Sequence, residues 1–184
     1  MQKQAENKIW KYIKDFAETI IISLLIAIVI KTFIIDTRVV PTASMLPTIQ
    51  LQDRLLVNKL SYKFGEIERG DVVVFKPPPG VETPKSFFFP ADLVKRAIGL
   101  PGEIVEVKKG SVYINGEAIE EHYLNAKPDY NYGPVTVPSN KILVLGDNRN
   151  ESYDSHYWGF LNKSNVKGRV FAIYWPINHL TLLK

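Results

Sequence analysis

A long apolar run near the start of the chain constrains its fold more than any other feature. Phe16 to Ile35 reads FAETIIISLLIAIVIKTFII and contains only two charged residues, Glu18 and Lys31, one toward each end. About twenty residues in a helix span roughly 30 Å, which matches the hydrocarbon core of a bilayer. The run therefore predicts a single transmembrane helix over residues 16–35.

The residues before this run predict its orientation. Residues 1–15 are polar and carry four lysines: Lys3, Lys8, Lys11 and Lys14. Such a segment favours the cytoplasmic side of the cell membrane, so residues 36–184 form the predicted extracytoplasmic domain. One alternative is a secretory signal cleaved near Ala43, although its apolar region would be long. A surface-lying helix conflicts with the stretch from Ile20 to Ile30, which is apolar on all sides.

Composition limits what the predicted extracytoplasmic domain can do. Its roughly 145 residues suffice for one domain with its own core. The chain has no cysteine, which excludes disulfides, thiolate metal sites and cysteine nucleophiles. Its net charge of +4 is dispersed and does not favour nucleic-acid binding. The acidic residues around Asp147 do not follow EF-hand spacing, so we expect neither a metal nor a cofactor.

Short apolar runs separated by turn residues predict a mainly β fold. The dipeptide Asn115-Gly116 is a strong hairpin signal. Many short strands of this kind are typical of an antiparallel β domain. The predicted strands lie within 51–62, 72–75, 93–100, 104–107, 111–114, 142–145 and 169–175. We interpret residues 117–138, which include His122, as an elaborated surface segment, with no role for His122.

A proline-rich and aromatic loop interrupts the predicted strands at residues 76–90. It contains three successive phenylalanines, Phe87 to Phe89. We expect these rings to pack on the core, and the alternative is that they dip into the bilayer surface.

Ser44 is the candidate nucleophile. It lies in the segment PTASMLPT, residues 41–48, whose two prolines restrain the backbone. Serine needs a neighbouring base to accept its proton. Lys95 is a candidate for that base because its neighbours in LVKRAIGL are apolar, and burial keeps a lysine amine neutral. The simpler interpretation of residues 41–48 is a linker after a membrane anchor.

Two other assemblies remain open on the residues alone. The first is a Ser–His–Asp triad of Ser44, His156 and Asp154, in which the alternation of Asp154 and His156 around Ser155 is a poor geometry for orienting an imidazole. The second has no catalysis: the chain would be an anchored β module that binds another component of the cell envelope.

Five segments in order resemble the bacterial type I signal peptidases, a family of membrane-bound Ser/Lys endopeptidases. They are the single N-terminal anchor, PTASMLPT at 41–48, QDRLLVNKLSY at 52–62, RGDVVVF with KRAIGLPGE at 69–75 and 95–103, and GDNRNESYDS at 146–155. The single anchor and compact size resemble the Gram-positive form. A self-cleaving repressor of the same superfamily is the runner-up enzyme, but it would need a DNA-binding segment in place of the anchor.

The resemblance implies a role for each matching residue. Ser44 would attack the scissile carbonyl and Lys95 would be the general base. The Thr42 hydroxyl and the Ser44 backbone N–H would stabilise the oxyanion, and Ser152 would orient the lysine amine. Asp154, Arg96 and Asp147 would support the site. The implied substrates are secretory precursors with signal peptides, cut after small residues in an Ala-X-Ala pattern at the bilayer surface.

Two residues depart from the pattern of that family. Gln52 stands where glycine often precedes the pair Asp53-Arg54. His156 stands where an arginine commonly follows Asp-Ser. The second change replaces the usual ion pair to Asp154 with a weaker and pH-dependent one.

Overall fold

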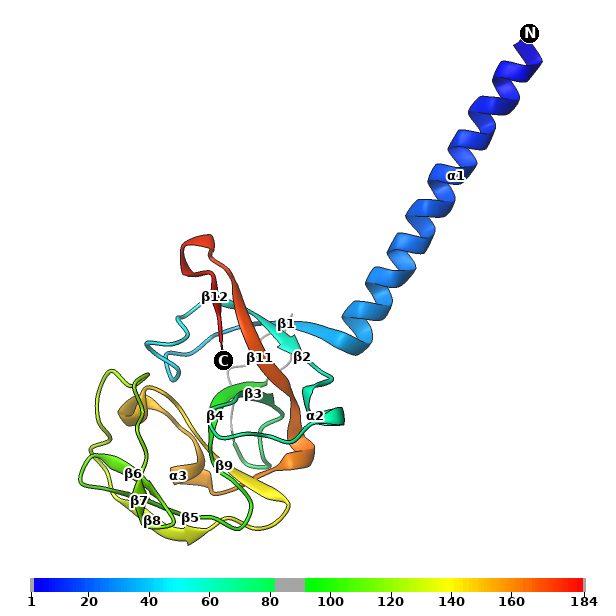
Figure 1. Cartoon of the computed structure of the whole chain (residues 1–184). Helices are drawn as coiled ribbons and strands as arrows, with labels where there is room; N and C mark the ends of the chain where they lie inside the picture. Colours follow the sequence, from blue (N-terminus) through cyan, green and yellow to red (C-terminus); the bar gives the residue numbers. More distant parts are fainter. Residues whose placement is uncertain (1, 82–91, 184) are drawn as a thin grey trace. The chain divides into compact units, whose positions relative to one another are not determined.

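The chain divides into two compact units, residues 1–36 and residues 37–184. The computed structural model describes residues 2–81 and 92–183 (Figure 1). The predicted packing of Phe87–Phe89 lies outside the described residues. Each unit is considered by itself below.

The first unit is helical. The α-helix α1 (Gln2–Val29) continues into a π-helical turn, η1 (Ile30–Ile34). The stretch Trp10–Ile34 is long and apolar enough to cross a membrane, and none of it is buried. The helix thus extends well before residue 16, since the polar residues ahead of the apolar run adopt the same helix. Ile35, predicted as the last residue of the helix, instead begins a strand.

The second unit confirms the prediction of a mainly β fold. The larger sheet has the strand order β1-β2-β11-β3-β4-β9-β10, with β12 also paired to β11. Its strands are β1 (Ile35–Val39), β2 (Arg54–Asn58), β3 (Val72–Phe75), β4 (Leu93–Gly99), β9 (Lys141–Leu145), β10 (Leu161–Asn162), β11 (Val166–Trp175) and β12 (Thr181–Leu182). Antiparallel pairs join β2 through β11, β3, β4 and β9 to β10.

A smaller antiparallel sheet has the order β7-β6-β5-β8 (Figure 1). Its strands are β5 (Ile104–Lys108), β6 (Ser111–Ile114), β7 (Glu117–Ala118) and β8 (Tyr132–Thr136). Short helical turns lie between strands of the larger sheet: α2 (Ser61–Phe64), η2 (Arg149–Glu151), α3 (Ser155–Trp158), η3 (Lys163–Asn165) and η4 (Ile177–His179). Apolar side chains of β5 and β6 pack with those of β4 and β9 in one buried cluster.

A second buried cluster includes three residues of the connection between β1 and β2, residues 40–53: Val40, Met45 and Ile49. Met45 and Ile49 are fully buried there beside apolar residues of β2, β3 and β11. Burying each of these side chains contributes about 1.5–3 kcal/mol. The segment that contains Ser44 is therefore part of the core, and the interpretation of it as a simple linker is wrong.

The same connection contains the unusual residue Gln52. Its φ of 67° lies in the left-handed region, and its backbone N–H donates to the Val40 carbonyl at 2.8 Å. Its side chain is exposed. Left-handed backbone costs about 1–2 kcal/mol for a residue with a Cβ, whereas glycine adopts it freely. This explains why glycine suits the position.

We predict that Gln52→Gly stabilises the protein by about 1 kcal/mol, because relief of the left-handed strain exceeds the added freedom of the unfolded chain. Chemical denaturation of the protein in detergent measures this. Gln50→Gly is the matched control, since Gln50 is exposed and lies outside the positive-φ residues. An equal loss of stability in both variants would contradict the explanation.

Candidate active site

Ser44 and Lys95 come together although 51 positions separate them in the sequence. The Lys95 amine donates a hydrogen bond to Ser44 Oγ. Both residues are buried, with 7% and 3% of their surface exposed. Thr42 Oγ1 lies 3.3 Å from Ser44 Oγ on the same turn. The structure thus assembles the predicted nucleophile, base and hydroxyl donor in one place.

The position of Lys95 accounts for its altered acidity. Lys95 lies in β4, opposite Val73 of β3, with β9 on the other side of β4. Burial lowers the pKa of Lys95 from 10.5 to about 8, although the charges of Asp154 and Asp147 act in the opposite direction and raise it. A buried ammonium loses hydration, so the neutral amine is favoured. The amine that contacts Ser44 is therefore much more readily deprotonated than an ordinary lysine.

The loop after β9 lies directly against the turn that carries Ser44. The Asn148 backbone N–H donates to the Ser44 carbonyl at 3.1 Å, and its side-chain amide donates to the Ala43 carbonyl at 3.2 Å. A Cβ on Gly146 would collide with the Ser44 carbonyl oxygen and with the Ser152 hydroxyl. Only glycine permits this close approach of the two segments.

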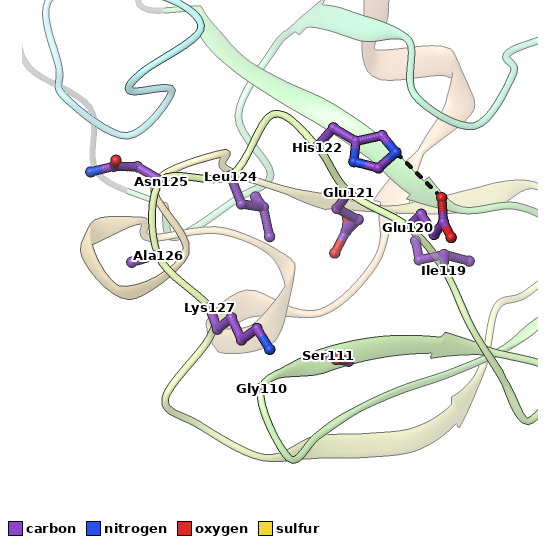
Figure 2. A pocket seen from close by; sticks show the side chains of 10 residues that line it. All are labelled: Gly110, Ser111, Ile119, Glu120, Glu121, His122, Leu124, Asn125, Ala126 and Lys127. Carbon is purple, nitrogen blue, oxygen red and sulfur yellow. Dashed lines mark ion pairs between the residues drawn. The ribbon is translucent and has the colours of Figure 1, made fainter.

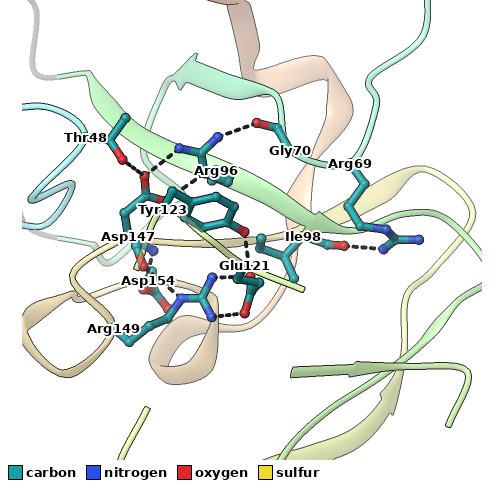
Figure 3. A network of polar contacts seen from close by, with 11 residues as sticks. Thr48, Arg69, Gly70, Arg96, Ile98, Glu121, Tyr123, Asp147, Arg149 and Asp154 are labelled. Carbon is teal, nitrogen blue, oxygen red and sulfur yellow. Dashed lines mark hydrogen bonds and ion pairs between the residues drawn. The ribbon is translucent and has the colours of Figure 1, made fainter. Parts of the chain in front are cut away.

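A buried ion pair fixes the start of this loop. Arg96 binds Asp147 through two hydrogen bonds, Nε–Oδ1 at 2.8 Å and Nη2–Oδ2 at 2.6 Å (Figure 3). Asp147 is fully buried and also accepts from Thr48 Oγ1 at 2.5 Å. Charge-assisted bidentate bonds of this kind are strong and directional. Arg96 and Asp147 thus tie β4, the loop after β9 and the turn of Ser44 together.

Asp154 and His156 form a close pair, contrary to the expectation of poor geometry. Asp154 Oδ1 lies 2.7 Å from His156 Nδ1, and Oδ2 accepts from the Gly146 N–H at 2.8 Å. The pair forms because Asp154 caps α3, which folds the imidazole back over the carboxylate. Tyr130 stacks on the His156 ring with the centroids 4.1 Å apart. Between residues 37 and 183, as far as they are described, no hydrogen bond joins His156 to Ser44.

Ser152 is also buried, with 4% of its surface exposed, and it lies against Gly146. Its hydroxyl has no hydrogen-bond partner among the residues that the structure describes. The predicted contact with the Lys95 amine is thus not formed as a hydrogen bond, and the orienting role of Ser152 stays a prediction.

Two residues of this region were not anticipated from the sequence. Glu121 and Tyr123 belong to the irregular segment between β7 and β8. Glu121 binds Arg149, and the Tyr123 ring lies against Arg96, the neighbour of Lys95 (Figure 3). The only sequence signal was a carboxylate two positions before an aromatic residue in a polar segment. That signal is too common to single out.

The same segment borders a hollow of about 510 Å³ (Figure 2). Its lining includes Ser111, Glu121 and Lys127, and none of the predicted site residues. His122 is 89% exposed in its side chain and pairs with Glu120 at 3.3 Å. Over residues 2–81 and 92–183, no group of three or more histidine, aspartate or glutamate residues is arranged to hold a metal ion.

The fold and the site together define a class of protein. An antiparallel β domain carries a buried serine hydroxyl that accepts a hydrogen bond from a buried lysine amine, with a second hydroxyl beside it. This arrangement suits nucleophilic attack on a carbonyl.

Comparison with known proteins gives the family. The family described as "Signal peptidase, peptidase S26" matches residues 13–175. The chain is 46% identical over 169 residues to a probable signal peptidase I-2 of Synechocystis, with 92% of this chain and 76% of that protein covered. It is 45% identical over 179 residues to a signal peptidase I of Leptolyngbya laminosa, with 97% and 86% covered.

A third relative comes from a Gram-positive bacterium. The signal peptidase I S of Bacillus subtilis is 37% identical over 182 residues, with 92% of this chain and 93% of that protein covered. The chain therefore belongs to the signal peptidase family, peptidase S26. The alternative of a non-catalytic binding module finds no support in these relatives.

Proposed function

We propose that this protein removes N-terminal signal peptides from secreted precursors, with Ser44 as the nucleophile and Lys95 as the neutral general base. The observation that carries the assignment of these roles is the hydrogen bond between the buried Lys95 amine and the Ser44 hydroxyl. Membership of the signal peptidase family supplies the reaction and the class of substrate.

The reaction proceeds through an acyl-enzyme. Lys95 accepts the proton of the Ser44 hydroxyl as Ser44 Oγ attacks the scissile carbonyl carbon. The tetrahedral intermediate collapses, the C–N bond breaks, and the Lys95 ammonium returns the proton to the leaving amine. Water then attacks the ester with Lys95 again as base, which frees the cleaved signal peptide and restores Ser44.

Charge on the tetrahedral oxygen needs donors placed in advance. The Thr42 hydroxyl, 3.3 Å from Ser44 Oγ, and the backbone N–H of Ser44 are the proposed donors. Fixed donors in a site shielded from water stabilise such an oxyanion without reorganisation. The burial that favours the neutral form of Lys95 therefore also strengthens these two hydrogen bonds.

Four further residues support the reacting groups. Ser152, whose buried hydroxyl has no partner in the described structure, is proposed to orient the Lys95 amine when substrate binds. Asp154 holds the Gly146 N–H, and the pair of Arg96 and Asp147 holds the loop to β4. These contacts position the site without taking part in bond making.

The substrate is proposed to bind as an extended strand, with small side chains at the first and third positions before the cut. This agrees with the Ala-X-Ala pattern at the end of signal peptides. Residues 16–34 are the proposed membrane span, residues 1–15 are cytoplasmic, and the residues from Ile35 onward face the outside. Ser44 is nine residues past Ile35, at most about 30 Å of extended chain, so the nucleophile stays near the bilayer.

We predict that Ser44→Ala and Lys95→Ala each lower kcat/KM by at least about 1,000-fold. The assay is cleavage of a precursor whose signal ends in Ala-X-Ala by the full-length protein in detergent. Ser139→Ala and Lys76→Ala are matched controls, because both side chains are exposed, and they should cut as the parent does.

Two results would contradict these roles. An active Lys95→Ala together with an inert His156→Ala would favour a triad of Ser44, His156 and Asp154. Parent-like cleavage by Ser44→Ala would remove Ser44 from the mechanism.

We further predict that Thr42→Val lowers kcat by about 100- to 1,000-fold with little change in KM, because it removes one oxyanion donor at nearly constant volume. Thr42→Ser keeps the hydroxyl and should retain most of the activity. Steady-state kinetics on the same precursor distinguish the two variants. Equal activity of Thr42→Val and the parent would exclude the hydroxyl as a donor.

A further inference from the structure

A carboxylate from the smaller sheet's connecting segment neutralises an arginine at the centre of the loop after β9. Glu121 accepts two hydrogen bonds from Arg149, at 2.7 and 2.6 Å. The Arg149 side chain is completely buried and that of Glu121 is 5% exposed. The Tyr123 hydroxyl donates to the same carboxylate at 2.5 Å. Figure 3 shows these three side chains meeting beside Asp147 and Asp154.

This cluster reaches the nucleophile through the backbone of one residue. Arg149 Nε donates to the Gly146 carbonyl at 3.0 Å. Gly146 in turn packs so closely on the Ser44 carbonyl that no Cβ would fit between them. Glu121, Arg149, Gly146 and Ser44 therefore form a continuous chain of contacts.

A second route leads to the base. The Tyr123 ring lies 3.9 Å from the guanidinium carbon of Arg96, within cation–π range. Arg96 adjoins Lys95 in β4 and binds Asp147. Glu121 and Tyr123 thus contact two parts of the site's surroundings: Arg149 in the loop after β9 and Arg96 in β4.

The guanidinium of Arg149 depends on Glu121 for its charge balance. Burial lowers the pKa of Arg149, but the hydrogen bonds and charge of Glu121 outweigh this and raise it above its ordinary value. An arginine stays protonated in proteins. Without Glu121 the cation would be buried and unpaired, and it would reorient toward water or other acceptors. Its hold on the Gly146 carbonyl would then be lost.

We propose that Glu121 is a positioning residue for the Ser44–Lys95 pair, acting through Arg149 and Gly146, with Tyr123 fixing its carboxylate. This inference rests on the proposed function, since it assigns Glu121 to the same reaction. Nothing in it requires Glu121 to touch the substrate.

The test compares Glu121→Gln with Glu120→Gln in the full-length protein in detergent, using the Ala-X-Ala precursor. Glu120 is the adjacent carboxylate, and its side chain is 86% exposed. Glu121→Gln should lower kcat by about 10- to 100-fold with KM within about twofold, as expected for a displaced reacting group. Glu120→Gln should match the parent in both constants.

The pH profile of kcat/KM separates positioning from simple destabilisation. Glu121→Gln removes one negative charge from this cluster while Arg149 keeps its positive charge, and the added net positive charge disfavours the ammonium form of Lys95. The acid limb, which reports Lys95 in the free enzyme, should therefore move to lower pH. A variant that only reduced the folded fraction would keep the parent's limb, and that result would overturn the proposal.

Tyr123→Phe decides the matter if Glu121→Gln does not fold, as judged by thermal denaturation. It keeps the ring on Arg96 and removes only the hydroxyl bond to Glu121. A fall in kcat of about 2- to 5-fold at constant KM supports the proposal, and parent-like kcat overturns it.

Ser44→Ala, measured in parallel, separates the proposed function from the proposed role of Glu121. If Ser44→Ala stays active the proposed function fails and this inference with it, whereas an inert Ser44→Ala with parent-like Glu121→Gln removes only the inference.

Discussion

The contact between the Lys95 amine and the Ser44 hydroxyl is the interaction on which the rest of the site depends. A lysine in water is protonated at neutral pH and cannot accept a proton from serine. Burial in the central strand β4 reduces that obstacle by lowering the pKa of Lys95 to about 8, so that about a tenth of the amine is neutral at pH 7. The fold must therefore bury Lys95 without a strong ion pair, while Asp147 and Asp154 stay close enough to support the neighbouring backbone.

The structure meets this requirement by directing its charges elsewhere. Asp147 is bound by Arg96, and Asp154 is bound by His156 and the Gly146 N–H. Each carboxylate thus has its own partner and acts on Lys95 only through its remaining charge.

Much of the fold and of the candidate site was predictable from the sequence, because the sequence signals for these parts are local. The apolar run, the short strands and the hairpin turn follow from periodicity and turn chemistry. Ser44 stood out by its place between two prolines just after the apolar run, and Lys95 by its apolar neighbours. Glu121 and Tyr123 did not, because their importance arises from contacts 28 and 27 positions away in the sequence, to Arg149 and Arg96. The Asp154–His156 geometry was misjudged for a similar reason, since a strand-like alternation was assumed where a helical cap forms.

A direct titration of Lys95 tests the central claim. Site-resolved NMR of lysine-labelled full-length protein in detergent micelles, with the signal assigned by its loss in Lys95→Ala, would follow the protonation of this amine. A midpoint at about 8 is the predicted result. A midpoint near the ordinary 10.5 would contradict the account, because only about 1 in 3,000 of the Lys95 amines would then be neutral at pH 7 and another group would have to activate Ser44.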